Sequence, residues 1–210
     1  MNINDVDSKG IPSLDPTDGD DWLTKIFQRQ QILHDKYKTI EHESGIGLSL
    51  IQNRAFSIDD KTCQYVIKDF AWRVTEEIAE AAEAYDAGNE MHFLEEVIDA
   101  LHFYTELLIL VGIGPADLSE PPRDSYKYQT PGEHMFNVIQ SLGLSMNTLK
   151  QKPWKQHHFP TDRNLFHSHI TRGYWELLWL LFSRELRTSD IYEIYYKKSE
   201  VNRFRQRSNY

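Results

Sequence analysis

The longest regular pattern in the chain lies between Thr62 and Val111, where apolar residues recur every three or four positions. This spacing places them on one face of a helix. The pattern is interrupted only at Gly88 and Asn89, and a glycine with a polar neighbour is typical of a helix end and turn. The segment therefore predicts two helices joined by a short loop, which favours an antiparallel hairpin. The two apolar stripes comprise Ile67, Phe70, Ala71, Val74, Ile78, Ala81 and Tyr85 on the first helix, and Leu94, Val97, Ile98, Leu101, Thr105 and Leu108 on the second.

Helical spacing of apolar residues is also found at 22 to 37, 135 to 149, 164 to 187 and 190 to 206. The first of these helices is expected to end before Gly45, and Thr188 or Ser189 is a candidate N-cap for the last. The proline-containing stretch 119–130 is typical of an exposed connection. The sequence therefore predicts an all-α helical bundle built on the hairpin.

The length of 210 residues suits one domain with a substantial core. Residues 1–21 carry six aspartates among glycine, serine and proline, and cannot bury enough apolar area to offset the entropy of ordering. We expect a flexible acidic tail at 1–21 and a single domain at 22–210.

Composition excludes several classes of function. The formal charge of −9 opposes binding to nucleic acid or anionic lipid, because both require excess Lys and Arg. No apolar run approaches the roughly 18 residues of a membrane span. The first twenty residues lack the apolar core of a signal peptide, so a cytoplasmic location is expected. A single cysteine, Cys63, cannot form an internal disulfide and is expected to be buried.

Acidic residues cluster within the predicted hairpin. Glu77 with Glu80, and Glu96 with Asp99, are three positions apart and therefore share a helical face. They lie at the border of the apolar stripes, so we expect them to face the partner helix. The alternative is a solvated acidic face, as most helical charge clusters are.

The hairpin lacks basic residues that would relieve this cluster, because no Lys or Arg follows Arg73 on either helix. Uncompensated carboxylates at a helix interface repel one another unless a divalent cation neutralises them. Ligands that are all oxygen favour Mg²⁺ or Mn²⁺. The spacing therefore indicates a metal site.

The C-terminal segment is basic in an otherwise acidic chain. On a helix, Lys198, Asn202 and Arg205, with Gln206, share one face that offers donors to phosphate oxygens. The alternative is a basic helix end that complements the helix dipole. A second cluster places Trp154 between two lysines, as would suit a nucleotide base, although a tryptophan anchored on the core is the simpler interpretation.

The acidic motifs Glu77-Ile78-Ala79-Glu80 and Glu96-Val97-Ile98-Asp99 resemble the paired motif of the all-α NTP pyrophosphatases, which include the MazG-like enzymes and the dimeric dUTPases. Further features are similar to the branch of dimeric dUTPases and phage dCTP-dUTP pyrophosphatases. They are Tyr195-Tyr196, Lys198, Asn202, Arg205-Gln206 and Tyr210 in the tail, His102-Phe103 after the second motif, and the Lys152 to Lys155 cluster.

The resemblance implies a homodimeric enzyme that hydrolyses dUTP, and in some relatives dCTP, to the monophosphate and pyrophosphate. It implies that Glu77, Glu80, Glu96 and Asp99 hold Mg²⁺, with Mn²⁺ as a substitute. Glu77 and Glu80 would be the catalytic carboxylates, with Glu77 as the base. The substrate would be bound by Gln30 or Gln31, Trp154 and Lys155 near the base, and by Lys198, Asn202, Arg205, Gln206 and Tyr210 near the phosphates or sugar.

Three positions depart from the family pattern. His34 stands where relatives often carry an asparagine, and Asn209 replaces a glycine before the final tyrosine. The Lys152 to Lys155 cluster follows both acidic motifs, whereas in some relatives it lies between them. These departures affect the predicted base and sugar contacts more than the predicted metal site.

Two alternatives remain open at the level of sequence. The same chemistry can act on another deoxynucleoside triphosphate, as in MazG-like proteins. A helical docking module can also use the acidic hairpin as a binding surface without any turnover. For the dimer, the aromatic residues Trp175, Trp179 and Phe182 on one predicted helix form the expected self-complementary patch.

Overall fold

The computed structural model describes residues 21–41, 45, 47–52, 55–118, 129–151, 154, 156 and 159–207, with the backbone alone at 41, 203 and 205–207. These residues form the α-helices α1 (Trp22–Glu41), α2 (Lys61–Asp86), α3 (Glu90–Leu110), α4 (Pro131–Thr148), α5 (Arg163–Phe182) and α6 (Thr188–Arg207), and the short 3₁₀ helices η3 (Gly47–Ile51) and η4 (Pro115–Asp117). No strand occurs among them, so the predicted all-α fold is confirmed. Apart from Asp21, the predicted tail at 1–21 lies outside the described residues.

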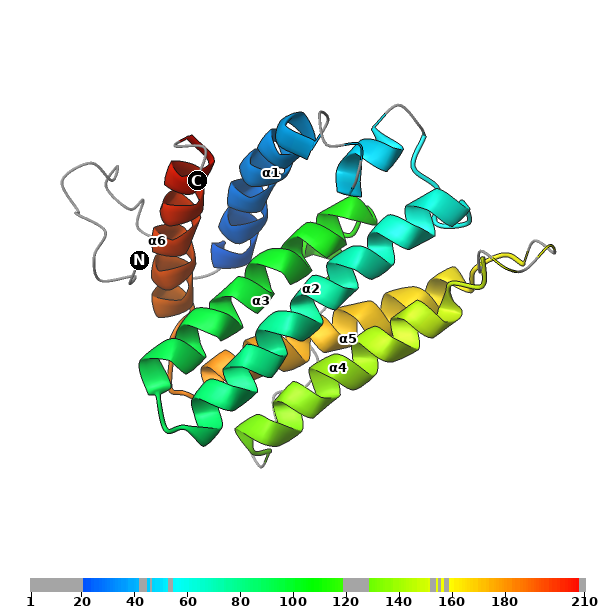
Figure 1. Ribbon diagram of the computed structural model, residues 1–210. Coiled ribbons are helices and arrows are strands. Elements are labelled where there is room, and N and C mark those ends of the chain that lie inside the picture. The colour runs from blue at the N-terminus through cyan, green and yellow to red at the C-terminus, as the bar shows by residue number, and fades with distance from the viewer. Residues whose placement is uncertain are drawn as a thin grey trace.

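Helices α2 and α3 form the predicted antiparallel hairpin (Figure 1). The Asp60 side chain caps α2 by accepting hydrogen bonds from the N–H groups of Thr62 and Cys63. Gly88 takes a positive φ of 68° in the turn, a conformation that favours glycine, and Asn89 then caps α3. The two predicted signals at Gly88 and Asn89 therefore end one helix and begin the next.

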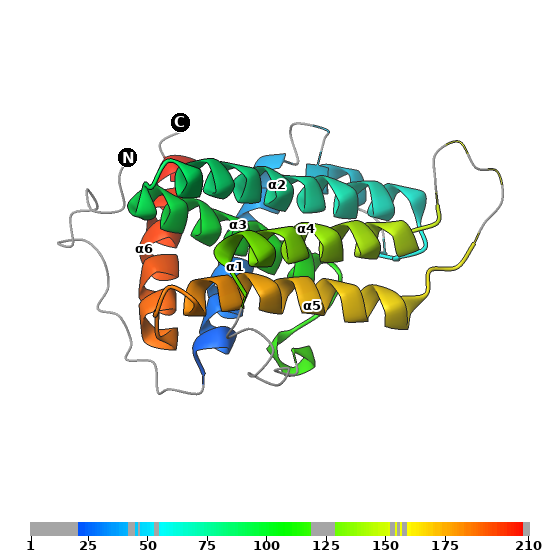
Figure 2. The same ribbon diagram turned by 90° about the horizontal axis from the view of Figure 1, so that it is seen from below.

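The other helices pack around this hairpin. Helices α4 and α5 lie side by side and form a second layer beneath it (Figure 2). Helix α6 lies beside α1 at one end of the molecule and crosses the direction of α4 and α5. This arrangement covers α3 with α1 and α6 on one side and with α5 on another.

The core follows the predicted apolar stripes. On α2 every residue of the stripe is buried except Tyr85, and Cys63 is fully buried as expected. Helix α3 is buried over more of its circumference than its stripe predicts, because helices pack on several of its faces. The additional buried apolar residues of α3 are Phe93, Ala100, Tyr104, Leu107 and Leu110.

A close helix approach occurs at Gly173 of α5. A Cβ atom built on this glycine would lie well inside contact distance of the Tyr104 hydroxyl, and 2.9 Å from Cβ of Ser141. The Tyr104 hydroxyl occupies this space while donating to the Ile170 carbonyl at 2.9 Å. The absence of a side chain at Gly173 thus allows α3, α4 and α5 to meet.

The prediction of an exposed dimer patch on α5 is wrong. Trp175 and Trp179 are buried within the monomer, and Phe182 is partly buried with its ring edge-on to Trp22 at 6.1 Å between centroids. Helical periodicity identified these residues as one apolar face, but both tryptophans are buried within the single chain and Trp22 of α1 packs on Phe182. The patch is therefore core.

The boundaries of the last two helices also differ from those predicted. Helix α5 ends at Phe182, and a turn follows in which Glu185 takes a positive φ of 62°. Helix α6 begins at Thr188, so Thr188 and Ser189 are helical residues. The side chain of Asp190 accepts hydrogen bonds from the backbone N–H and the guanidinium of Arg187.

Among the described helices, none combines the length and apolar character needed to cross a membrane.

Candidate functional site

Three carboxylates converge where α2 faces α3. Glu77 projects from α2, and Glu96 and Asp99 from α3, with a ligand oxygen of each within 4.8 Å of the others. Glu96 and Asp99 share a face because they are three residues apart. The hairpin then places that face opposite Glu77. Glu96 is buried and the other two acids are partly buried, so these three of the four predicted acids meet between the two helices.

The crowding of these groups changes their ionisation. Burial, the adjacent Glu96 carboxylate, which can accept a hydrogen bond from protonated Glu77, and the charges of Asp99, Glu96 and Glu80 raise the pKa of Glu77 to about 8. Carboxylates that lie this close suppress one another's ionisation, and a bound cation would relieve the repulsion between them. Because all donors are carboxylate oxygens, the set fits a hard divalent ion such as Mg²⁺ or Mn²⁺.

Glu80, the fourth predicted ligand, lies apart from this group. It is exposed on α2, one turn beyond Glu77, and is not among the three acids that converge. Its charge still contributes to the raised pKa of Glu77, so it lies within electrostatic reach of the cluster.

Two basic side chains flank the acids. Lys198 of α6 places its Nζ 2.6 Å from Oδ2 of Asp99, which brings the basic C-terminal helix to the acidic hairpin. His92 of α3 places its Nδ1 2.9 Å from Oε1 of Glu96. Sequence reasoning missed His92, although its spacing of four residues from Glu96 was a usable signal.

The remaining predicted phosphate contacts lie further along α6. Asn202 is one turn beyond Lys198 and is half-buried. Arg205 and Gln206 belong to the last turns of the helix, but their side chains lie outside the described residues, as does the whole of Tyr210. Helix α6 therefore presents Lys198 to the acids and directs Asn202 along the same face.

Helix α6 is held against α1 by Arg29, which sequence reasoning missed. The Arg29 guanidinium donates to Ser199 Oγ at 3.0 Å, forms an ion pair with Glu200 and lies 4.1 Å from the ring centroid of Tyr196. Glu200 was the one acid in the basic tail, and its partner on a distant helix explains its presence.

Comparison with known families identifies the chain. A family model described as dUTPase matches residues 23–210. The chain belongs to the all-α dUTPase family. No curated protein and no solved structure matches it. Membership of the family supports a dUTP-hydrolysing activity with a nucleotide substrate, and the converging carboxylates supply a place for the divalent metal that such enzymes typically use.

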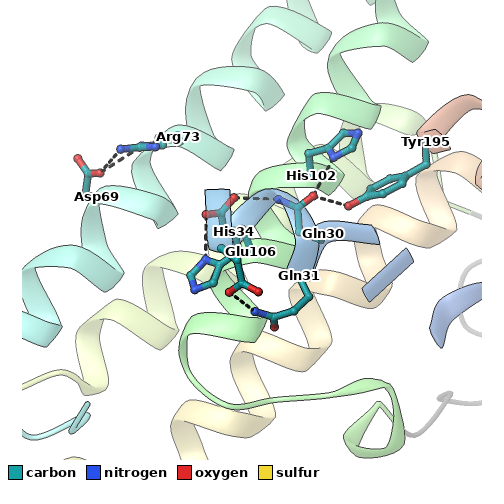
Figure 3. A network of polar contacts seen from close by, with 9 residues as sticks. Gln30, Gln31, His34, Asp69, Arg73, His102, Glu106 and Tyr195 are labelled. Atoms are coloured by element: carbon teal, nitrogen blue, oxygen red, sulfur yellow. Dashed lines mark hydrogen bonds and ion pairs between the residues drawn. The ribbon is translucent and has the colours of Figure 1, made fainter. Parts of the chain in front are cut away.

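The two glutamines expected near the base differ sharply in this dUTPase family member (Figure 3). Gln30 is buried, and its amide bonds to Glu106, His102 and Tyr195. Gln31 is exposed and donates from Nε2 to Oδ1 of Asp35 at 2.9 Å. Of the two, Gln31 is the one that solvent and a ligand can reach.

The loop expected to carry a base contact is anchored away from the acids. Trp154 is 77% exposed, while nearby Gln151 donates its backbone N–H to Oε1 of Gln64 at 2.9 Å. Gln64 lies near the start of α2, about 20 Å along the helix from Glu77 at 1.5 Å per residue. The structure therefore does not bring Trp154 to the acidic cluster, and Lys152 and Lys155 lie outside the described residues.

Proposed function

We propose that this member of the all-α dUTPase family hydrolyses dUTP to dUMP and pyrophosphate in a Mg²⁺-dependent reaction. One observation carries the proposal: the oxygens of Glu77, Glu96 and Asp99 lie within 4.8 Å of one another, and Lys198 of a distant helix adjoins them. Such a site offers oxygen ligands to a cation and an ammonium group to a phosphate chain.

Glu77, Glu96 and Asp99 would hold Mg²⁺, or Mn²⁺ in its place, and Glu80 is one turn away on α2. When bound, the cation neutralises charge on the phosphate oxygens and so stabilises the transition state. Lys198 would turn its ammonium from Asp99 toward the phosphates, with Asn202 and Arg205 as further donors along α6.

Glu77 is our candidate for the base. It belongs to the converging group, so its carboxylate would lie next to a water that attacks the bound triphosphate. The proton of the attacking water would pass to this carboxylate as the water oxygen bonds to phosphorus and the pyrophosphate leaves. Glu80, the second catalytic candidate, would act by orienting that water.

For the choice of nucleotide we propose dUTP first and dCTP second. The exposed Gln31 is our candidate for the base contact, because a side-chain amide can pair with uracil or cytosine according to its orientation. Its hydrogen bond to Asp35 would have to be exchanged for one to the base.

We also propose that the enzyme is a homodimer, through a face other than the buried tryptophans. An apolar groove between α2 and α4 is lined by residues that include Ile78, Ala82, Met135, Phe136 and Ile139. Phe136 is 63% exposed there. Light scattering on wild type and Phe136→Ser is expected to give a dimer and a monomer; an unchanged dimer in the variant would exclude this face.

The activity is tested by pyrophosphate release from dUTP, dCTP, dTTP, dATP and dGTP, each with Mg²⁺ and with EDTA. We expect Mg²⁺-dependent turnover of dUTP that is lost in Glu96→Gln. The matched control is Glu83→Gln, because Glu83 is an exposed acid of the same hairpin outside the converging group. Turnover in the control is expected to remain that of wild type.

Each outcome of this panel has a distinct meaning. Turnover of a purine nucleotide alone would reassign the substrate within the same chemistry. No turnover of any nucleotide would remove the enzymatic proposal and favour a docking module. Turnover that persists in EDTA would exclude the converging carboxylates as a metal site required for the reaction.

A further inference from the structure

The buried amide of Gln30 connects three helices (Figure 3). Gln30 of α1 is only 1% exposed. Its Nε2 donates to Oε2 of Glu106 on α3 at 2.8 Å. Its Oε1 accepts from the Tyr195 hydroxyl of α6 at 2.6 Å and meets Nδ1 of His102 on α3 at 2.9 Å. One side chain thus ties α1, α3 and α6 together.

The direction of these hydrogen bonds is fixed by Glu106. A carboxylate only accepts hydrogen bonds, so the N–H side of the Gln30 amide must face it and the carbonyl oxygen must face His102 and Tyr195. The other oxygen of Glu106 lies 3.1 Å from Nδ1 of His34. Because the carbonyl oxygen of Gln30 only accepts hydrogen bonds, His102 carries its proton on Nδ1 and donates a hydrogen bond to that oxygen. Burial, and then the charge of Lys198, lower the pKa of His102 to about 3, which keeps the ring neutral.

Two of the three residues bonded to Gln30 are each one helical turn from the ion pair at the site. His102 follows Asp99 by three residues on α3, and Tyr195 precedes Lys198 by three on α6. The rings of His102 and Tyr195 are stacked, with centroids 3.8 Å apart and planes 20° from parallel. Helices α3 and α6 therefore meet at two successive levels: this ring stack, and the contact between Asp99 and Lys198 at 2.6 Å.

We propose that Gln30 is a positioning residue: its amide clamps His102 and Tyr195 together and so fixes the register at which α6 presents Lys198 to Asp99. It acts through Lys198 and makes no contact with the nucleotide base. This inference rests on the proposed function, because that function gives Lys198 and Asp99 their roles in the reaction. It replaces the sequence-based prediction of Gln30 as a base contact, since the amide is buried and already bonded at both ends.

The test is a double-mutant cycle of Tyr195→Phe and Lys198→Met. Tyr195→Phe removes one donor to Gln30 and keeps the stacked ring, so it is the mildest way to loosen the clamp. The matched control is Tyr104→Phe, which also removes a buried tyrosine hydrogen bond from the core but lies outside the clamp. Thermal unfolding of every variant shows how far each substitution affects folding alone.

Turnover is the first readout. A small displacement of Lys198 is expected to lower kcat/KM about tenfold in Tyr195→Phe, equally for each nucleotide that the wild type hydrolyses. The double variant is expected to be no worse than Lys198→Met, because both substitutions remove the same contribution. Tyr104→Phe is expected to lose thermal stability without this loss of kcat/KM. Additive losses in the double variant, or a changed ratio of dUTP to dCTP turnover in Tyr195→Phe, would overturn the proposal.

Mn²⁺ binding to the nucleotide-free protein, measured by calorimetry, is the second readout and does not depend on turnover. Because Lys198 competes with a cation for Asp99, Lys198→Met is expected to tighten Mn²⁺ binding roughly fivefold. Tyr195→Phe is expected to act in the same direction, with no further gain in the double variant. An unchanged Mn²⁺ affinity in Tyr195→Phe would overturn the clamp. If no nucleotide is hydrolysed, the proposed function fails, while this second cycle still decides whether Gln30 holds Lys198 at Asp99.

Discussion

Glu77 of α2 faces Glu96 of α3 across the hairpin, with a carboxylate oxygen of each within 4.8 Å of the other. Two carboxyl groups held this close repel each other when both are ionised, and they can share a hydrogen bond only when one of them carries a proton. Burial and the neighbouring charges place that proton on Glu77, whose pKa is raised to about 8. A cation that binds between these groups must therefore displace a proton.

Metal binding is accordingly expected to release a proton at neutral pH and to tighten as the pH rises toward about 8. Calorimetry in buffers of different ionisation enthalpy measures this proton release directly. In Glu77→Gln the released proton should be missing, and the weaker remaining affinity should depend less on pH. Equal proton release in wild type and Glu77→Gln would show that another group holds the proton.

The same group links stability to pH in the metal-free protein. The pKa of Glu77 in the folded state, about 8, lies above its ordinary value of 4.5. Its contribution to stability is therefore fully present below about 4.5 and is lost as the pH rises through about 8. In EDTA, the melting temperature of wild type should fall more steeply across this range than that of Glu77→Gln. Parallel curves for the two proteins would contradict this assignment.

Substitutions of the hairpin acids should lower turnover by different amounts, according to whether the acid belongs to the converging group. Asp99→Asn removes a converging carboxylate and is expected to lower Mg²⁺-dependent turnover by about 100-fold or more. Glu80→Gln is expected to cost less, because Glu80 is exposed outside the converging group. Steady-state kinetics over a range of Mg²⁺ concentrations checks this order. A loss in Glu80→Gln equal to that in Asp99→Asn would mean that Glu80 joins the ligand set on metal binding.

Gly173→Ala should destabilise the fold by about 1–3 kcal/mol, because the new methyl group would clash with Tyr104 and Ser141 where α3, α4 and α5 meet. The clash itself must exceed this net loss by roughly 1 kcal/mol, the gain that alanine brings within a helix. The control is Gly143→Ala on α4, where a Cβ would meet nothing within 4 Å and stability should be kept or improved. Urea unfolding compares the two. Equal effects at both positions would exclude the close approach as the cause.

A buried hydrogen-bonded pair and an exposed ion pair provide a second comparison. His134 and Glu176 are buried between α4 and α5, with Nδ1 3.0 Å from Oε2. Glu176→Ala should cost about 3 kcal/mol, because it leaves a buried polar group without its partner. Glu90→Ala breaks the exposed pair with Arg184 and should cost at most about 1 kcal/mol. Chemical denaturation measures both, and a smaller loss at Glu176 than at Glu90 would contradict the expectation.

The sequence predicted the hairpin and the convergence of Glu77, Glu96 and Asp99 because both depend on local rules. Helical periodicity, the turn at Gly88 and the three-residue spacing of the acids on α3 act over short stretches of chain. Three of the four predicted ligands meet as a result. The spacing could not show that Glu80 lies outside this group. A residue one turn further along a helix can project into solvent instead of toward the neighbouring helix.

These local rules do not predict contacts between helices that are distant in sequence. Periodicity marked Trp175 and Trp179 as members of an apolar face, but it does not specify whether another helix of the same chain or a second subunit covers that face. Gln30 was a candidate base contact only through the resemblance to the dUTPase branch, which did not distinguish it from Gln31. Its partners Glu106 and Tyr195 come from helices distant in sequence, so its role in the core became apparent only in the folded chain.

The short turn after α2 also has a consequence for the order of folding. Loop closure across a few residues is fast, so a nascent hairpin brings Glu77 and Glu96 together before contacts between distant segments form. Lys198, which neutralises Asp99 in the folded protein, belongs to the last helix and arrives only when α6 docks. Until then the repulsion among the acids is relieved only by protons or by cations from solution, so the refolding rate of this chain should increase with divalent cation concentration before any nucleotide is present.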